Sequence, residues 1–276
     1  MTRPRIKKLT TYREFENCVA IQRRVWKHSA HDLTPAHQFC IAIETGSILL
    51  GGYIGPSLAG FVYSFPALFQ GRLCQHSHLL AVLPRYQGSG LGKTLKWAQR
   101  DEAVKLGYGL MTWTYDPLQV RNATLNLHTL GATSRTYLPN FYGRIPSLLF
   151  SPDADSDRLK MEWVLRSDRV ARRRAKVFPP YDPACEVKAL EGRMKNGRLD
   201  PGPVRKDLDA GRLLIEIPRD LKKYRRQPGY IRAWQGALHR ALGRYFERGW
   251  RLADFIQTDR CFYVLEKKVA GLKDNK

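Results

Sequence analysis

The stretch "YQGSGLGKT", from Tyr86 to Thr94, combines residue types whose spacing could do chemistry. Glycines let a backbone pass close to a phosphate, and the N–H groups at the start of a helix point towards one. The final Lys-Thr also matches the end of the P-loop pattern G-x-x-x-x-G-K-[ST], which binds nucleotides. That pattern needs a glycine six residues before Lys93, where this chain has Gln87. The loop therefore predicts a phosphate site with a tighter turn than a P-loop.

The residues around this loop predict a strand before it and a helix after it. "HSHLLAVLP" is apolar with β character and stops at Pro84. "GKTLKWAQRDEAVKL" then repeats apolar residues at helical spacing. A second strand, "GLMTWTYDP", stops at Pro117, and a short helix in "RNATLNLHTLGA" has Gly131 as its stop signal. The order strand, turn, helix, strand predicts an α/β domain whose site lies where two strands part.

Other segments extend this pattern. "TYREFENCVAIQRRVW" predicts an amphipathic helix, and "CIAIET", "SILLGGYI" and "SLAGFVYSFPA" predict successive strands. Two more strands are predicted in "RTYLPNFYG" and "RLKMEWVLRS". The fold expected is therefore a mixed, mainly antiparallel sheet flanked by helices.

Composition shifts predict three regions. Residues 1–168 form the main domain, and residues 169–210, rich in Pro, Gly and charge, read as a basic linker or irregular insertion. Residues 211–276 hold a strand, a long helix and a hairpin. This last segment is too small for a comfortable core of its own, so we expect it to pack onto the first domain as an α/β extension.

The composition of the 276 residues is globular, with 43% hydrophobic and 26% charged residues, but the net charge is +22. The excess is spread over both halves, and such a field attracts nucleic acid, acidic surfaces or a polyphosphate cofactor. A generally basic, solvated surface explains it equally well. Charge alone therefore names no partner.

Several classes of protein are disfavoured. The five cysteines form no C-x-x-C pair, which argues against a zinc site or a disulfide framework and fits a reducing compartment. The N-terminus lacks the apolar region of a signal peptide. The apolar run from Phe39 to Phe69 is interrupted every few residues by glycine or proline, unlike a membrane span. We expect a soluble cytoplasmic protein without a metal.

"VLPRYQGSGLGKTLKWAQRDEA" resembles the acetyl-CoA-binding motif of the GNAT acyltransferase superfamily, Q/R-x-x-G-x-G/A between a strand and a helix. Further pieces resemble one branch of it, predicted acyltransferases often found beside o-succinylbenzoate synthase or N-acylamino acid racemase. The most specific piece is "TWTYDPLQVRNATLNLHTLGA", and others are "SHLLAV", "TYLPNFYG", "DRLKMEW", "LLIEIP" and "GWRLADF". The resemblance covers roughly residues 10–168 and 211–266. It implies a GNAT-like acyl-CoA N-acyltransferase fold.

The resemblance also implies where acetyl-CoA or another acyl-CoA binds. The pyrophosphate is expected on backbone N–H groups of the turn, from Gln87, Gly88, Ser89, Gly90, Leu91, Gly92 and Lys93, with help from the helix dipole. The pantetheine arm is expected between the strands that end at Val82 and Tyr115. It would pair with the backbone of Leu80, Ala81 and Val82, where an N–H could stabilise an oxyanion. The side chain of Lys93 is either a phosphate neighbour or a solvated helix residue.

Two amides are further candidates for the cofactor site. Asn122 and Asn126 are i, i+4 neighbours, expected on one face of a helix that borders the cofactor in the family. They either bind CoA or serve as cap and surface amides.

Acyl transfer needs a base for the attacking amine and a neutralised leaving thiolate. His78 lies two residues before Leu80, on the same expected strand face as His76, and imidazole titrates in the useful range. It is the candidate catalytic base, or else a structural histidine. Asp116 and Tyr142 are candidate substrate contacts, although Asp116 could instead relay a proton or cap a turn. Many GNAT enzymes carry an acid tyrosine where this chain has Leu127, so the acid is unassigned.

The function expected is CoA-dependent N-acylation of a small amine such as an amino acid, by direct attack in a ternary complex with acetyl- or succinyl-CoA as donor. The alternative is a basic nucleic-acid-associated binding protein that uses a GNAT fold without catalysis. The segment "RVARRRAKVF" is basic but poor in aromatic residues, and no known nucleic-acid motif occurs. A homodimer is a further assembly to test.

Overall fold

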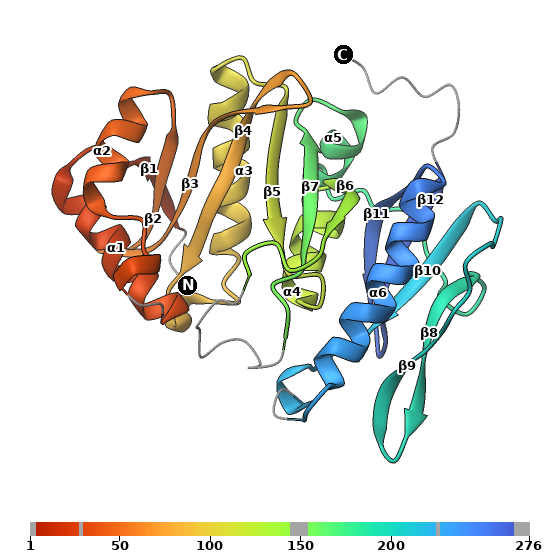
Figure 1. Cartoon of the computed structure of the whole chain (residues 1–276). Helices are drawn as coiled ribbons and strands as arrows, with labels where there is room; N and C mark the ends of the chain where they lie inside the picture. Colours follow the sequence, from red (N-terminus) through yellow and green to blue (C-terminus); the bar gives the residue numbers. More distant parts are fainter. Residues whose placement is uncertain (1–3, 28–29, 144–153, 225–226, 268–276) are drawn as a thin grey trace. The chain divides into compact units, whose positions relative to one another are not determined.

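The computed structural model describes residues 4–27, 30–143, 154–224 and 227–267. These fall into two compact units that divide after Trp113. Figure 1 shows the helices and strands of the chain. The division lies inside one strand, and the boundary expected at residue 168 stays a prediction. None of the helices in these ranges combines the length and apolar character that a membrane crossing requires.

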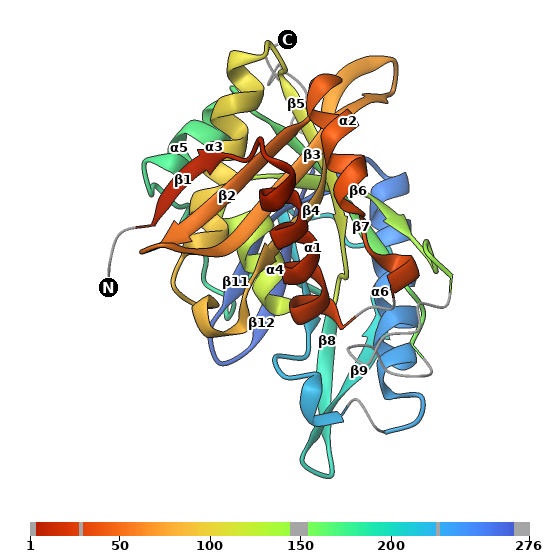
Figure 2. The same cartoon turned by 90° about the vertical axis from the view of Figure 1, so that its left-hand side faces the viewer.

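The first unit is a sheet with helices on both faces. Its strands lie in the order β1-β2-β3-β4-β5, antiparallel from β1 to β4 and parallel between β4 and β5. Figure 2 shows the helices α1 and α2 in front of these strands. The elements are β1 (Arg5–Lys8), α1 (Tyr12–Trp26), α2 (Ala36–Glu44), β2 (Ile48–Ile54), β3 (Ser57–Phe69), β4 (Arg72–Val82), α3 (Leu91–Lys105) and β5 (Leu110–Tyr115), with short 3-10 turns at Ala30–Asp32 and Pro84–Tyr86.

The strand predicted in "CIAIET" is wrong, because these residues belong to α2 and the turn after it. Phe39 and Ala42 are buried while Ile41 between them is 58% exposed, which is helical rather than alternating burial. The periodicity of such a short apolar run does not distinguish a helix from a strand. The remaining strands and helices predicted in this unit are confirmed.

An aromatic cluster fixes α1 and α2 on the sheet. The ring of Phe39 lies 6.2 Å from Phe15 of α1, 6.2 Å from Phe61 and 5.1 Å from Tyr63 of β3. All four rings are almost fully buried. Aromatic pairs of this size dominate the energetics of a core, so this face of β3 is held rigidly.

The second unit is a mixed sheet with strands in the order β7-β6-β11-β12-β10-β8-β9. Only the contact between β10 and β8 is parallel among the pairings described within this unit. The elements are α4 (Val120–Ala123), a π-helix (Thr124–Thr129), β6 (Thr133–Leu138), β7 (Arg158–Val164), α5 (Asp168–Arg174), β8 (Lys188–Lys195), β9 (Arg198–Val204), β10 (Arg212–Ile217), a 3-10 turn (Lys222–Tyr224), α6 (Tyr230–Glu247), β11 (Trp250–Gln257) and β12 (Cys261–Lys267).

The predicted fold class, a mixed and mainly antiparallel α/β sheet flanked by helices with a C-terminal α/β extension, is confirmed. The C-terminal strand, helix and hairpin are β10, α6 and β11–β12. The segment expected to be an irregular insertion holds regular elements instead, namely α5 and the β8–β9 hairpin. The strand β9 was not predicted because it contains the sequence "DPGP", and proline and glycine are rare in strands.

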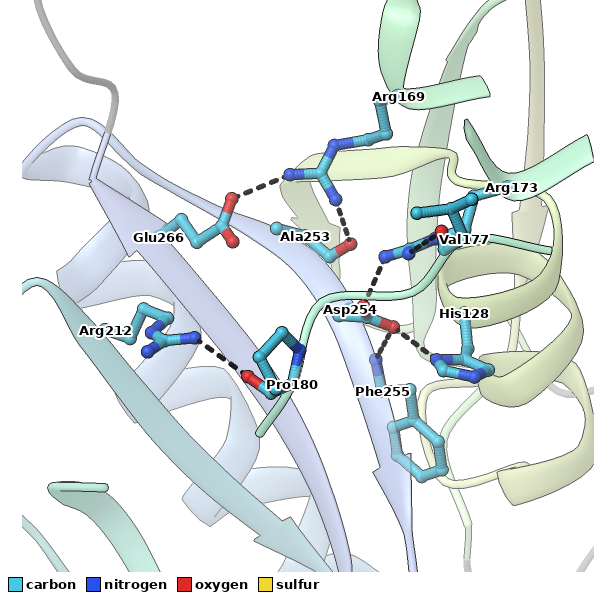
Figure 3. Close-up of polar contacts among 10 residues, drawn as sticks. All are labelled: His128, Arg169, Arg173, Val177, Pro180, Arg212, Ala253, Asp254, Phe255 and Glu266. Atoms are coloured by element: carbon cyan, nitrogen blue, oxygen red, sulfur yellow. Dashed lines mark hydrogen bonds and ion pairs between the residues drawn. The ribbon is translucent and has the colours of Figure 1, made fainter. Parts of the chain in front are cut away.

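A buried ion-pair network fixes the second unit (Figure 3). Asp254 of β11, fully buried, pairs with Arg173 of α5 and lies 2.9 Å from Nδ1 of His128 in the π-helix. Its carboxylate also accepts the N–H of Phe255 at 2.8 Å. Nearby, Arg169 of α5 donates to the carbonyl of Ala253 at 2.9 Å and reaches Glu266 at 2.7 Å. Charged groups thus join α5, β11, β12 and the π-helix.

Candidate active site

The loop after β4 forms a tight left-handed turn that leads into a helix. Gly88 and Gly90 have φ values of 83° and 84°, in the region that favours glycine. Gly90 is the N-cap of α3 and carries no side chain to cap the helix. Because the first N–H groups of an α-helix have no partner within it, those of Leu91, Gly92 and Lys93 point out of the helix end. This end can hold an anion.

Two members of the predicted phosphate turn instead hold the loop together. The N–H of Gln87 donates to Pro84 at 3.2 Å, and its side-chain amide donates to the carbonyl of Val82 at 3.0 Å. Ser89 donates to the carbonyl of Tyr86 from its hydroxyl at 2.7 Å and its N–H at 3.4 Å. In the part of the chain that the structure describes, no hydrogen bond occupies the N–H of Gly88 or Gly90. The available donors are therefore fewer than expected.

Gly92 is a glycine that the protein's own packing does not require. A Cβ placed there would lie 3.8 Å from Leu80 Cδ2 and 3.9 Å from Val82 Cγ2, which is ordinary van der Waals contact. Its φ is not left-handed, unlike that of Gly90. The missing side chain instead leaves the first turn of α3 open, so that a phosphate could approach the backbone closely. The residues therefore fit the pyrophosphate of CoA.

Beyond its first half, β4 has an open edge. The pairing between β4 and β5 consists of Gln75 with Met111 and His76 with Thr112 in the described structure, although β4 continues to Val82. The predicted parting of the two strands is thus observed within the first unit. An open strand edge presents unpaired backbone groups that can bind an extended ligand.

The register shows which residues face this edge. Leu83 donates its N–H to Ala59 of β3 at 2.9 Å. Antiparallel pairs alternate between bonded and non-bonded, so the backbone groups of Leu80 and Val82 point away from β3. Ala81 pairs with Phe61 and is fully buried, so it lies in the core and not at the edge. The carbonyl of Val82 is already used by Gln87.

His78 is the extra residue of a β-bulge. Ser77 pairs with Ser64 and Leu79 with Tyr63, so His78 has no partner opposite it on β3. The rings of His78 and His76 both lie near Phe65, at centroid distances of 5.8 and 5.4 Å. This confirms the face shared with His76.

The bulge also moves Leu80 to the face of α3, beside Gly92. His78 and Leu80 therefore lie on opposite faces, although residues two positions apart in a regular strand share a face. The His78 side chain remains exposed, yet the protein atoms around it disfavour its charged form and lower its pKa. A histidine that stays neutral at physiological pH is suited to act as a base.

The two candidate substrate contacts lie in the second unit. Asp116 accepts the N–H of Leu118 at 2.9 Å, which is a turn-capping role, and burial raises the pKa of its carboxyl group. Tyr142 is exposed and its hydroxyl lies 3.0 Å from that of Thr114, with the guanidinium of Arg158 over its ring. Their roles toward a substrate remain predictions.

The structure places Asn122 in α4 and Asn126 in the π-helix that follows it. The helix changes from α to π geometry after Ala123, with the N–H of Leu130 donating to Leu125 at 2.9 Å. Asn122 is exposed and Asn126 is buried. Their binding of CoA stays a prediction.

Neither Leu127 nor Tyr137 provides a general acid for the leaving thiolate. Leu127 is fully buried, and Tyr137 donates its hydroxyl to Asp157, with burial as the main cause of its raised pKa. A tyrosine held in this way is a weak proton donor.

The sequence reasoning missed a buried lysine on α3. Lys96 is 3% exposed, and its Nζ lies 2.9 Å from the hydroxyl of Ser77 and 3.0 Å from Oε1 of Gln99. The same amine lies 3.9 Å from the ring centre of Trp113. Its position between the buried residues Leu95 and Gln99 places it on the inward stripe of the helix, which the helical period could have revealed.

No family model and no curated protein matches the chain. Solved structures that resemble it are acetyltransferases. The ribosomal-protein-S18-alanine N-acetyltransferase from Escherichia coli is 18% identical over 59% of this chain and 94% of its own, with a TM-score of 0.47. A GNAT-family acetyltransferase from Streptococcus pneumoniae is 15% identical over 58% of this chain and 98% of its own (0.47). The PaiA N-acetyltransferase from Thermoplasma acidophilum, in complex with coenzyme A, is 16% identical over 58% and 98% (0.43).

Proposed function

We propose that this chain is a GNAT-like, CoA-dependent acyltransferase that acylates the amine of a small molecule such as an amino acid. The observation that carries the proposal is the open first turn of α3 at Gly92, directly beside the open edge of β4. One feature suits a pyrophosphate and the other an extended arm with amide groups. Together they match the pyrophosphate and the pantetheine arm of a CoA molecule.

Each residue has a distinct role in this proposal. The N–H groups of Gly88, Gly90 and Gly92 hold the pyrophosphate, and the backbone of Leu80 pairs with the arm. Bound acyl-CoA supplies an activated thioester, with acetyl- or succinyl-CoA as the expected donor. His78 takes the proton that the attacking amine sheds, because its lowered pKa keeps it neutral.

The test is calorimetric titration with CoA, acetyl-CoA, succinyl-CoA and ATP at physiological salt, comparing wild type with Gly92→Ala. The added methyl has room in the protein, so folding should be unchanged or improved, by up to about 1 kcal/mol for a glycine replaced in a helix. It should push a phosphate away from the N–H groups and weaken CoA binding at least tenfold, about 1.4 kcal/mol.

Gly243→Ala is the matched control. Gly243 lies in α6, and a Cβ there meets nothing within 4 Å. It should leave CoA affinity unchanged. Equal CoA affinity in Gly92→Ala and wild type would contradict the site, and binding of ATP without CoA would favour a nucleotide-binding loop. Once CoA binds, a screen of amines with acetyl- and succinyl-CoA would identify the acceptor.

The net charge of +22 supports a second candidate, a nucleic-acid-associated binding protein. Binding that depends on phosphate neutralisation falls steeply with salt. Nucleic-acid affinity retained at physiological salt, without CoA binding, would favour this function over the acyltransferase.

A further inference from the structure

Lys96 of α3 is buried beneath the point where β4 and β5 part. Ser77 is the first residue of β4 after the last paired residue, His76, and Trp113 is the first of β5 after Thr112. The Nζ of Lys96 contacts both, at 2.9 Å from the Ser77 hydroxyl and 3.9 Å from the Trp113 ring centre. The amine therefore lies at the closed end of the gap between the strands.

The open edge leads from the glycine turn to this closed end. Gly92 contacts Leu80 and Val82, at the loop end of β4. From Val82 back to Ser77 the strand spans roughly 17 Å, at about 3.3 Å per residue. The pairing of His76 with Thr112 then closes the gap. If the pyrophosphate of CoA binds at the turn, the far end of its arm, which carries the sulfur, extends towards Lys96.

The surroundings of Lys96 make its proton easy to lose. The Nζ of Lys96 contacts the hydroxyl of Ser77, the amide oxygen of Gln99, the thioether of Met111 and the indole of Trp113, which are uncharged groups. Burial disfavours the ammonium form and lowers the pKa of Lys96 to about 7. An acid with a pKa near the working pH is an efficient proton donor.

We propose that Lys96 is the proton donor to the CoA thiolate that leaves in acyl transfer. The inference rests on the proposed acyl-CoA site and supplies the acid that neither Leu127 nor Tyr137 can provide. The amine nitrogen bonds to the carbonyl carbon, the C–S bond breaks with its electron pair on sulfur, and sulfur takes a proton from Lys96 Nζ. The proton shed by the amine passes to His78. Solvent exchange then restores the protonated lysine and the neutral histidine.

The test measures the thiol pKa of enzyme-bound CoA and needs neither turnover nor the identity of the amine. The ultraviolet absorbance of the thiolate is recorded against pH for free CoA and for CoA saturated with protein. The Lys96 ammonium and the CoA thiolate stabilise each other and titrate as a coupled pair, so we expect thiolate to form in bound CoA about one pH unit or more below free CoA. In Lys96→Met the bound thiol should titrate close to free CoA.

Lys105→Met is the control for loss of a positive charge from α3, because Lys105 is an exposed residue at the end of the helix. It should keep the lowered thiol pKa. If Lys96→Met does not fold, Lys96→Gln tests the same point with a hydrogen-bonding side chain. Lowered thiol pKa in the Lys96 variants and wild type alike would overturn the role of Lys96 while leaving the CoA site intact. Absence of CoA binding in wild type would overturn both proposals.

Discussion

His76 Nδ1 lies 3.0 Å from the hydroxyl oxygen of Thr112, on the last pair of residues that join β4 to β5. This side-chain bond reinforces the parallel pairing at the point where the strands part. Ser77 and His78 follow directly on β4, and one faces α3 while the other lies against Phe65. The closed end of the gap thus places groups of different chemistry on the two faces of the sheet.

Thr112→Val should loosen this closed end without changing its shape. Valine has the volume of threonine but cannot bond to His76, and Thr112 is 2% exposed. We expect the free energy of unfolding to fall by about 1 kcal/mol, the typical net value of such a bond. Chemical denaturation measures it. Unchanged stability would mean that another group or water replaces the lost hydroxyl.

His78→Gln should abolish the base while keeping a polar side chain of similar length. Once an acceptor is known, we expect kcat/KM to fall by roughly 10² to 10⁴, the usual contribution of a general base. The wild-type profile should rise with pH as His78 loses its proton, with a midpoint below 6.5 because its pKa is lowered. It should fall again near pH 7 as Lys96 becomes neutral. A rising limb that persists in His78→Gln would assign the base to another group.

The sequence predicted the strand, turn and helix around the glycines, because left-handed turn glycines and helical spacing are local signals. It could not predict which N–H groups remain available for a ligand. The side chain of Gln87, for example, donates to the carbonyl of Val82, and this bond depends on the folded position of that carbonyl. The bulge at His78 is also hidden, because it is a property of the register between two strands. The π-helix that contains Asn126 has no local signature comparable to proline or glycine.

The lysine on α3 was overlooked for a different reason. Hydrophobic periodicity assigns charged residues to the solvent side, whereas Lys96 lies on the inward stripe with Leu95 and Gln99. The network around Asp254 could not be predicted, because its members Arg173 and His128 lie far from Asp254 in the sequence. Buried charges require partners that only the folded chain brings together.

Lys96→Met should remove a pH dependence of stability that the buried lysine creates. The pKa of Lys96 is about 7 in the folded chain and about 10.4 in an unfolded one, so between these values the unfolded chain binds more protons. Stability gained from this group therefore rises with pH in that window, by up to about 1.4 kcal/mol per pH unit.

The variant lacks this slope and should be more stable than wild type at pH 7, with the advantage shrinking towards pH 9. Denaturation of both proteins at pH 7, 8 and 9 measures the difference. A difference that stays constant with pH would show that Lys96 has an ordinary pKa.

Asp254→Asn should strongly destabilise the second unit. Asp254 is fully buried and accepts from Arg173 and from the N–H of Phe255, so the change removes the charge that balances Arg173, whose side chain is 3% exposed. Breaking one partner of a buried pair typically costs about 3 to 5 kcal/mol.

Glu266→Gln is the comparison, because Glu266 and its partner Arg169 are 25% and 22% exposed. An ion pair nearer the surface is worth at most about 1 kcal/mol, so this variant should unfold almost like wild type. Chemical denaturation followed by tryptophan fluorescence measures the loss, and the buried Trp163, Trp234 and Trp250 of this unit contribute to that signal. Equal losses in the two variants would show that solvent screens Asp254 as effectively as Glu266, and the network would then be a surface feature rather than the centre of the unit.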